Sequence, residues 1–475
     1  MQEKYTKKNK IKLGFAPTRR NVFVREEAIK RKLKIEGYLK ANNIDYVGID
    51  WLNEEGLMIT HQDALKVADK FIGEKVDAIF TPHCNFGSEG ACGALGKLVN
   101  RPYLLWGERD DGRNAEGNGM TDAQCGLFAT SKMLNRLGIP FTYVTNTKIE
   151  DPIWDRGFHN FIGAAAVAKS VRNVRIGQIG PRPDGFHSTA CNEAELRERF
   201  NIEIVPVSVV DIYLDLETVM AENSRQLDEY ETDLASRITI YEPGAREGVR
   251  KMAGLKIVIE RWAEREELSA IAIQCWHAIR KVINIQTCFT NGELTGDGLP
   301  VCCETDVHGA ITSIMMQSAR LGEAPTFFTD MTIRNPENNN SELLWHCGNF
   351  PSCLSCTAEE RMLTGGSVPG KGHWGIKGGD ITLSRFDGMH GEYSLFIGEA
   401  KGITGQYSRG VYVWAEVNDW PLWEHKIIHG PYIHHMSGIH GKVAPILYEA
   451  CKYIPGLKPD PVNPTAAEIE KYLRG

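Results

Sequence analysis

The chain has 475 residues, of which 42% are hydrophobic and 24% are charged, a composition typical of globular proteins with room for about three domains. Its formal net charge of -7 argues against a general nucleic-acid or anionic-membrane surface. No apolar run approaches the ~18 residues of a membrane-spanning helix. We therefore expect neither nucleic acid nor membrane among its partners.

Cysteine usage and the N-terminal stretch bear on the cellular compartment. The first ten residues are basic and lack the apolar stretch of a signal peptide. Twelve cysteines without an export signal indicate reduced thiols in a cytoplasmic protein. The residue types of a zinc site occur at Cys347, Cys353 and Cys356, with His346 beside them. A structural zinc site normally needs two CxxC pairs, and these cysteines form only one. This pattern favours free thiols over a structural zinc.

The first third of the chain alternates short apolar strands with helices. The strand-like stretches are KLGFAP, DYVGID, DAIFT and YLLW, and the helices between them span about residues 26–42, 62–72 and 87–98. Repeated βα units predict a parallel sheet covered by helices on both faces. We assign residues 1–172 to a doubly wound domain.

Polar side chains follow several of these strands, at the crevice positions where such sheets bind polar ligands. Arg19, His83 and Trp106 are the candidates there. Neither a GxGxxG motif nor a phosphate loop follows a strand, so no dinucleotide or nucleoside triphosphate is expected.

The strand and helix pattern restarts at NVRIGQIGPRPDGF and continues through helices at about residues 193–200 and 247–267 to the strand AIAIQCW, with Gln274 at its end. We predict a second doubly wound domain over residues 173–325. Two such domains in series resemble periplasmic sugar-binding proteins. An alternative function is therefore a sugar-binding or regulatory protein without turnover.

From about residue 345 onwards the pattern of the sequence changes. Glycines are frequent, and the stretches DITLSRF, EYSLFIGEA and GVYVWAEV alternate apolar and polar residues, which is typical of short antiparallel strands in a barrel or sandwich. A helix at about residues 443–453 and a short terminal helix follow. The fold class predicted is α/β, with two doubly wound parallel-sheet domains followed by a mostly antiparallel β-barrel over residues 326–475.

Two carboxylates bracket a helix in the stretch CETDVHGAITSIMMQSARLGEAPTFFTD. Glu304 precedes the helix, one face of which is expected to be buried, and Asp330 follows a short strand over residues 326–329. Both acids fall at the ends of elements, where open α/β sheets build their sites. A structural interpretation is equally open, in which Glu304 favours the positive end of the helix and Asp330 is a loop acid.

Four histidines lie within HGPYIHHMSGIHGK, among them His434 and His435. In an extended segment these two point in opposite directions, so at most one faces a given site. Two carboxylates and a neutral imidazole suit Mn²⁺, with Mg²⁺, Co²⁺ or Fe²⁺ as alternatives. Taken singly, each histidine is more simply a hydrogen-bonded loop residue.

With these motifs the chain resembles the L-fucose isomerase and L-arabinose isomerase superfamily. The features that carry the resemblance are RIGQIGPRPDGF, ETDVHGA at Glu304, Asp330 after the next strand, His346 in LLWHCGNFP, and HHMSGIHGKVAPILYEACKYIP. They cover nearly the whole chain in the same order of three domains. The length is closer to the arabinose branch, and the carboxylate pair is closer to the fucose branch.

The resemblance implies aldose–ketose isomerisation through a cis-enediol, on a pentose or 6-deoxyhexose such as L-fucose, D-arabinose or L-arabinose. Glu304 and Asp330 would bind the metal and move a proton between C1 and C2. Either His434 or His435 would complete the coordination, with His346 as a further candidate. A metal that polarises the sugar oxygens and a carboxylate that carries the proton suit this chemistry.

The resemblance also implies that Arg19, His83, Trp106 and Gln274 contact the sugar. The first domain would reach the active site of a neighbouring subunit, so that a homo-oligomer of six chains shares its active sites. Arg19 and Trp106 have an alternative role in supporting local loops. A metal-dependent aldolase or epimerase is a further alternative function.

Overall fold

The computed structural model describes residues 9–113, 116–117 and 119–475, so most of the basic N-terminal stretch lies outside the described residues. The chain divides into two compact units. The N-terminal unit comprises residues 10–169, 449–454 and 467–475, and the remaining residues form the large unit. The large unit holds most of the second and third predicted domains, and the three-domain division stays a prediction.

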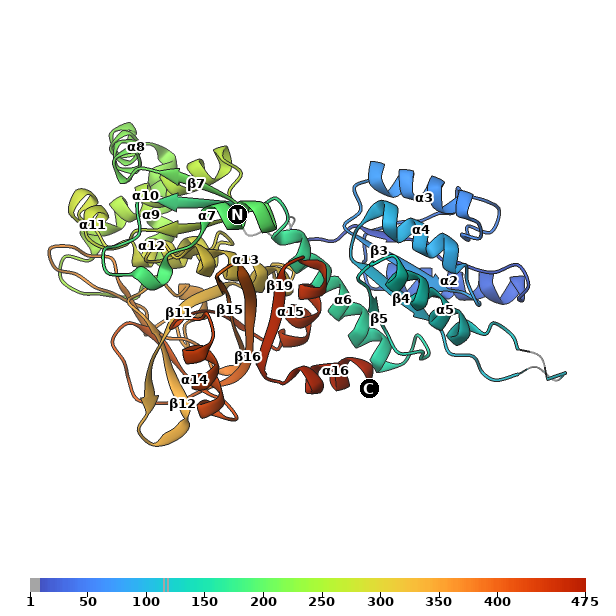
Figure 1. The fold of residues 1–475 in the computed structure, drawn as a ribbon. Coiled ribbons are helices and arrows are strands. Elements are labelled where there is room, and N and C mark those ends of the chain that lie inside the picture. Colours follow the sequence, from blue (N-terminus) through green and yellow to red (C-terminus); the bar gives the residue numbers. More distant parts are fainter. Residues whose placement is uncertain (1–8, 114–115, 118) are drawn as a thin grey trace. The chain divides into compact units, whose positions relative to one another are not determined.

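The N-terminal unit contains a five-stranded parallel sheet in the order β2-β1-β3-β4-β5. Alternate residues of β3 face opposite layers: Ile79 packs in the core with α3 and α4, and Phe80 packs against Trp154 and Phe158 of α6. Helices on both faces confirm the doubly wound prediction (Figure 1). The elements are β1 (Leu13–Phe15), α2 (Arg25–Ala41), β2 (Tyr46–Val47), α3 (His61–Gly73), β3 (Ala78–His83), α4 (Glu89–Val99), β4 (Tyr103–Gly107), α5 (Ala123–Arg136), β5 (Thr142–Tyr143) and α6 (Pro152–Ser170).

The large unit begins with a four-stranded parallel sheet in the order β10-β9-β6-β7, as predicted. Two helices in it, α8 and α9, were not anticipated from the sequence. The signals were present, because Ser208 and Ser224 cap their first turns. The elements are β6 (Arg175–Ile179), α7 (Glu193–Phe200), β7 (Glu203–Val207), α8 (Val209–Glu222), α9 (Arg225–Ser236), α10 (Val249–Arg265), β9 (Ala270–Ile273), α11 (Ala278–Ile283), α12 (Cys288–Gly296), β10 (Val301–Cys302) and α13 (Val307–Ala319).

The predicted antiparallel barrel is confirmed. Strands β16-β15-β18-β11-β12-β17 lie side by side, and the pairing of β16 with β17 closes the ring. Three outer pairings are parallel, β19 on β16, β14 on β17 and β8 on β13. The elements are β8 (Ile240–Tyr241), β11 (Thr326–Asn335), β12 (Asn338–His346), β13 (Met362–Leu363), β14 (Gly372–Gly375), β15 (Gly379–Met389), β16 (Glu392–Ile403), β17 (Val411–Glu416), α14 (Trp420–His429), β18 (His435–His440), α15 (Ala444–Ala450), β19 (Leu457–Asn463) and α16 (Ala466–Arg474).

Strand β11 is longer than predicted. It continues to Asn335 and forms a hairpin with β12, so Asp330 lies in the middle of the strand and not at its end. The prediction that the strand stops at residue 329 was wrong. Its second half, MTIRN, is polar and partly exposed, and the antiparallel partner supplies the backbone hydrogen bonds that the local pattern did not reveal.

Helix α13 is buried on every side, whereas the sequence predicted one buried face. All of its residues are buried because it packs against β6 and β9 of the parallel sheet and against β15 and β18 of the barrel. Asp306 caps its first turn by accepting the Gly309 N–H at 2.8 Å. The loop that carries Glu304 is therefore held between the sheet and the barrel.

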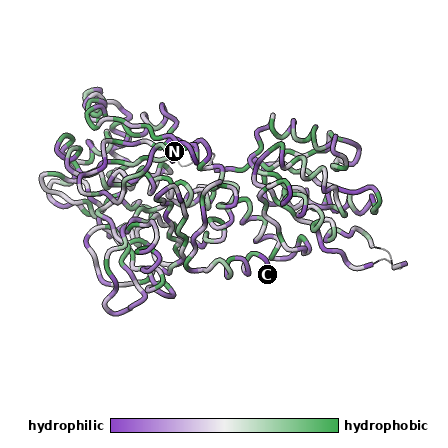
Figure 2. Tube along the Cα trace, viewed as in Figure 1, coloured by the Kyte–Doolittle hydropathy of each residue, from purple (hydrophilic) through white to green (hydrophobic). Residues whose placement is uncertain are grey.

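Hydrophobic and hydrophilic residues are interleaved in short stretches along the trace (Figure 2). Within the described part of the chain, no helix combines the length and the apolar character needed to span a membrane.

One buried acid in the barrel predicts a pH-dependent stability. Burial raises the pKa of Glu342 on β12 to about 7. The folded protein then holds this proton more tightly than the unfolded chain does. The resulting contribution to the free energy of unfolding is present at acidic pH and is lost as the pH rises through 7. Glu342→Gln should raise the unfolding free energy by about 1–2 kcal/mol at pH 8.5 and by much less at pH 5. Thermal unfolding at both pH values checks this, and an equal gain at the two would contradict it.

Candidate active site

Four side chains converge at one end of the barrel. Glu304 follows β10, Asp330 lies on β11, His346 ends β12, and His435 begins β18. Strands β18, β11 and β12 are neighbours, and the register places Asp330 opposite both His435 and Trp345. Strand pairing thus gathers residues that are far apart in the sequence.

Polar atoms of these residues face a common point. The His435 Nε2 lies 3.4 Å from the Asp330 Oδ1 and 4.0 Å from the Glu304 Oε2. The His346 Nε2 lies 3.6 Å from the Glu304 Oε2 and 3.9 Å from the Asp330 Oδ1. These separations exceed ordinary hydrogen bonds. The structure gives no hydrogen-bond partner to the Glu304 Oε2, Asp330 Oδ1 or His346 Nε2, all of them buried and described.

Buried polar atoms without partners are rare and call for an explanation such as a bound ion. Two carboxylate oxygens and two imidazole nitrogens suit Mn²⁺, Fe²⁺ or Co²⁺, and the paired carboxylates would also accept Mg²⁺. The residues present therefore fit a divalent metal. Glu304, Asp330, His346 and His435 are the residues that would hold it.

Electrostatics supports the same conclusion. Burial by itself would raise the pKa of Glu304, but the neighbouring His346 and His435 outweigh it, so the pKa is lowered and the carboxylate is ionised. Burial would lower the pKa of His346, yet Asp330 and its other neighbours raise it well above the usual value. The negative charge of the two acids therefore favours a positive charge at this point. A divalent cation would supply that charge while His346 stays neutral.

A second buried carboxylate, Asp306, orients His435. It contacts the His435 Nδ1 at 2.8 Å and also accepts a hydrogen bond from Arg385, which in turn binds Asp387 through its Nε at 2.8 Å. Burial would raise the pKa of Asp306, but Arg385 and His435 bring it far below its ordinary value. An ionised Asp306 accepts the Nδ1–H of His435 and directs the Nε2 lone pair at the site. The sequence analysis did not find Asp306 or Arg385, although Asp306 lies within the ETDVHGA motif.

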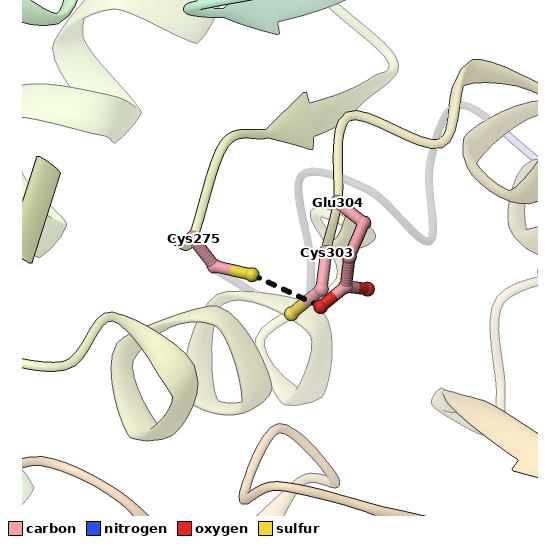
Figure 3. A group of neighbouring side chains, drawn as sticks. All are labelled: Cys275, Cys303 and Glu304. Atoms are coloured by element: carbon pink, nitrogen blue, oxygen red, sulfur yellow. Dashed lines mark hydrogen bonds between the residues drawn. The ribbon is translucent and has the colours of Figure 1, made fainter. Parts of the chain in front are cut away.

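A cysteine orients Glu304. Cys275, which follows β9, donates its S–H to the Glu304 Oε1 at 3.2 Å, and Cys303 lies beside the pair (Figure 3). Burial raises the pKa of the Cys275 thiol well above the usual value, so it is a neutral donor. The hydrogen bond holds one carboxylate oxygen and leaves the other for the site.

The backbone at Glu304 is strained. Glu304 and Thr305 have φ angles of 54° and 55°, in the left-handed region that residues with side chains seldom adopt. The Thr305 N–H donates to the Ile273 carbonyl at 3.1 Å, and the Asp306 N–H donates to the Cys303 carbonyl at 3.1 Å. Such strain persists where the surroundings enforce it and is frequent at functional sites.

His434 was expected to point away from any site that His435 faces. The structure places both imidazoles near Asp330, with one ligand atom from each of the three residues within 4.8 Å of the others. The expectation was wrong because His434 precedes β18 and does not follow the alternation of an extended strand. His434 is exposed, whereas His435 is buried.

A cavity of about 230 Å³ opens beside Glu304, Asp330 and His346. Two tryptophans in its wall, Trp276 and Trp345, offer aromatic faces of the kind that suit a sugar ring. Sequence reasoning missed both. Its lining residues are Cys275, Trp276, Arg280, Gln286, Cys288, Glu304, Asp330, Trp345, His346, Cys347 and Lys371.

Gln274 does not line this cavity in the structure, although it follows β9 as predicted. Its side chain is buried and its Oε1 has no hydrogen-bond partner among the described residues. A sugar contact by Gln274 stays a prediction.

The remaining sequence candidates lie in the N-terminal unit and contact residues of that unit. The Arg19 Nη2 donates to Glu55 at 2.9 Å, and the His83 Nδ1 meets the Phe86 carbonyl at 2.7 Å. Trp106 is fully buried, with its ring centroid 4.0 Å from that of Trp154. His83 and Trp106 lie within β3 and β4 and not after them. Their sugar-contacting roles stay predictions.

Comparison with known proteins finds sugar isomerases. Residues 14–172 match the family model described as the fucose/sulfoquinovose isomerase N-terminal domain. The sulfoquinovose isomerase of Priestia aryabhattai is 24% identical over 388 residues, covering 81% of this chain and 83% of that protein. The sulfoquinovose isomerase of Alkalicoccus urumqiensis is 26% identical over 360 residues, covering 74% of this chain and 78% of that protein.

One solved structure, an Actinobacillus succinogenes periplasmic solute-binding protein with bound D-allose, is 14% identical and covers 56% of this chain and 78% of its own. Its TM-score of 0.18 is too low to support an argument about fold or function. The site and the isomerase relatives define the class of the protein as an aldose–ketose sugar isomerase. These matches support the resemblance to the fucose isomerase-like superfamily.

Proposed function

We propose that this protein is a divalent-metal-dependent isomerase that converts a C6-sulfonated aldohexose of the sulfoquinovose type into the corresponding ketose. The observation that carries the metal dependence is the convergence of the partnerless Glu304 Oε2, Asp330 Oδ1 and His346 Nε2. The sulfonated substrate rests on the names of the relatives, and it replaces the pentose or neutral 6-deoxyhexose expected from the sequence.

In this proposal the metal and each of the site residues have separate roles in the isomerisation. A divalent metal, Mn²⁺ first and Mg²⁺, Co²⁺ or Fe²⁺ as alternatives, would polarise the sugar oxygens and acidify the C–H beside the carbonyl. Glu304, held by the Cys275 thiol, takes the proton from C2 and returns it to C1, while the hydroxyl proton of O2 passes to O1. Asp330 is a second carboxylate within reach of the same point. His435 keeps its orientation through Asp306.

The alternative of a sugar-binding or regulatory protein without turnover explains less. A binding site recognises hydroxyl groups through paired donors and acceptors, and it has no use for two buried carboxylates and an imidazole nitrogen that lack partners. The homo-oligomer with shared sites stays a prediction.

Metal removal tests the proposal. After chelation and dialysis, the protein should lose turnover of the 6-sulfo aldohexose, and added Mn²⁺ should restore it and raise the midpoint of thermal unfolding. Ketose formation and calorimetry measure the two effects. Turnover that survives complete metal removal would contradict the metal dependence, and cleavage products in place of ketose would indicate an aldolase.

A further inference from the structure

Two cationic side chains, Arg280 and Lys371, line the same cavity as Glu304, Asp330 and His346. In the part of the chain that the structure describes, neither side chain has an ion pair or a hydrogen bond with a protein group. Both are only partly exposed. Guanidinium and ammonium groups in a confined cavity normally require a partner, because removing them from water is costly.

Several other buried or half-buried cations of the large unit are paired with carboxylates. Arg237 binds Glu293 at 2.6 Å, Lys256 binds Glu260 at 2.8 Å, and Arg385 binds Asp387 at 2.8 Å. Arg280 and Lys371 differ from these in lying in a cavity wall without a carboxylate partner among the described residues. The two acids of the cavity do not serve them, because Glu304 and Asp330 face the histidines at the metal site.

The backbone positions of both residues are fixed. The Lys371 carbonyl accepts the Thr364 N–H at 2.9 Å, and the Lys371 backbone N–H donates to the Thr364 Oγ1 at 3.1 Å. Its Cα would lie 3.0 Å from a Cβ added at Gly348, so the chain passes close to the segment that carries His346. Ile279 and Ile283 are fully buried and anchor α11, the helix that presents Arg280.

The charge balance then indicates what the cavity receives. With a divalent metal, the two acids of the metal site are neutralised, and Arg280 and Lys371 leave the remaining wall positive. A ligand that suits both parts of the cavity needs sugar hydroxyl groups at the metal site and an anionic group beside Arg280 and Lys371. Arginine matches the planar spread of oxygens in a sulfonate, phosphate or carboxylate, and lysine adds a point charge.

We propose that Arg280 and Lys371 are the specificity-determining residues of the site and bind the anionic C6 substituent of the substrate, a sulfonate, while its C1–C2 end lies at Glu304 and Asp330. This inference rests on the proposed function and adds to it the residues that distinguish a charged sugar from a neutral one. The nearby exposed Lys281, on the same helix but outside the cavity lining, provides a matched control.

The test measures binding separately from turnover. The probes are the 6-sulfo hexitol and the neutral 6-deoxy hexitol of the same configuration, which have no carbonyl and cannot isomerise, titrated calorimetrically into the Mn²⁺-loaded protein. Arg280→Gln and Lys371→Gln should each weaken binding of the sulfo hexitol about 10-fold to 100-fold, as for a hydrogen bond to a charged group. Binding of the neutral hexitol should change less than about threefold, within the scatter of a surface substitution, and Lys281→Gln should leave both unchanged.

Equal weakening of both hexitols, or no effect of either substitution, would overturn the assignment of Arg280 and Lys371. Tighter binding of the 6-phospho hexitol or of the C6 carboxylate would overturn the sulfonate as the anion. In parallel, KM for the 6-sulfo aldohexose should rise in both variants while kcat changes little. If the hexitol discrimination is found but no sugar turns over, the isomerase proposal fails and the anion site stands.

Discussion

Glu304→Gln should lower the rate of ketose formation by about 10⁴-fold, the upper range for loss of a general acid–base group. The amide keeps the size of the side chain and can still accept the Cys275 S–H, so the loop geometry should survive. What it loses is the negative charge and the ability to carry a proton. Steady-state turnover of the 6-sulfo aldohexose at saturating Mn²⁺ measures the effect.

The Glu304→Gln experiment needs a control for the loss of a carboxylate. Glu323 is exposed in the turn after α13, and Glu323→Gln should leave turnover unchanged. A second readout is the shift in thermal unfolding that Mn²⁺ produces, which should shrink in Glu304→Gln because one anionic ligand is missing. Retention of a tenth or more of the wild-type rate would exclude Glu304 as the proton carrier.

Asp306→Asn should destabilise the large unit by about 3–5 kcal/mol, the usual effect of removing one partner from a buried ion pair. Arg385 is fully buried and would then keep only Asp387 of the two carboxylates that offset its charge. His435 would also lose the acceptor that fixes its Nδ1 proton, and affinity for Mn²⁺ should fall about 10-fold to 100-fold. Chemical unfolding and metal titration measure the two effects.

Arg385→Met separates the two effects expected for Asp306→Asn. It should destabilise the protein, because Asp306 loses its cation, while the contact between Asp306 and the His435 Nδ1 at 2.8 Å remains. Metal affinity should therefore fall less than in Asp306→Asn. If both variants lose metal affinity to the same extent, Asp306 acts on the site only through the stability of the fold.

Much of the fold was accessible from local patterns. The βα repeats of residues 13–107, the parallel strands β6 and β9, and the alternating strands β15, β16 and β17 were predicted, whereas α5 and β5 were not. Errors occurred where long-range packing overrode the local pattern. Helix α13 is buried all round because two layers sandwich it, and β11 continues through a polar stretch because β12 pairs with it.

The candidate site divides in the same way. The residue types of Glu304, Asp330, His346 and His435 suggested metal chemistry together with the resemblance to a family. The sequence could not show which of these side chains lie together. His434 is an example, because the direction of its side chain depends on where β18 begins. Asp306, Arg385 and Cys275 became visible only through contacts with residues up to 129 positions away.

By itself, the sequence determined most of the secondary elements and their order, the α/β and barrel classes, and the inventory of chemically active side chains, since each depends on periodicity and residue type over short stretches. The tertiary structure decided which side chains meet. Strand register brings Asp330 opposite His435, a strained turn aims Glu304 at both histidines, and two cations in the cavity wall lack partners among the described residues. Such arrangements depend on the pairing of distant strands and on burial, which no local pattern encodes.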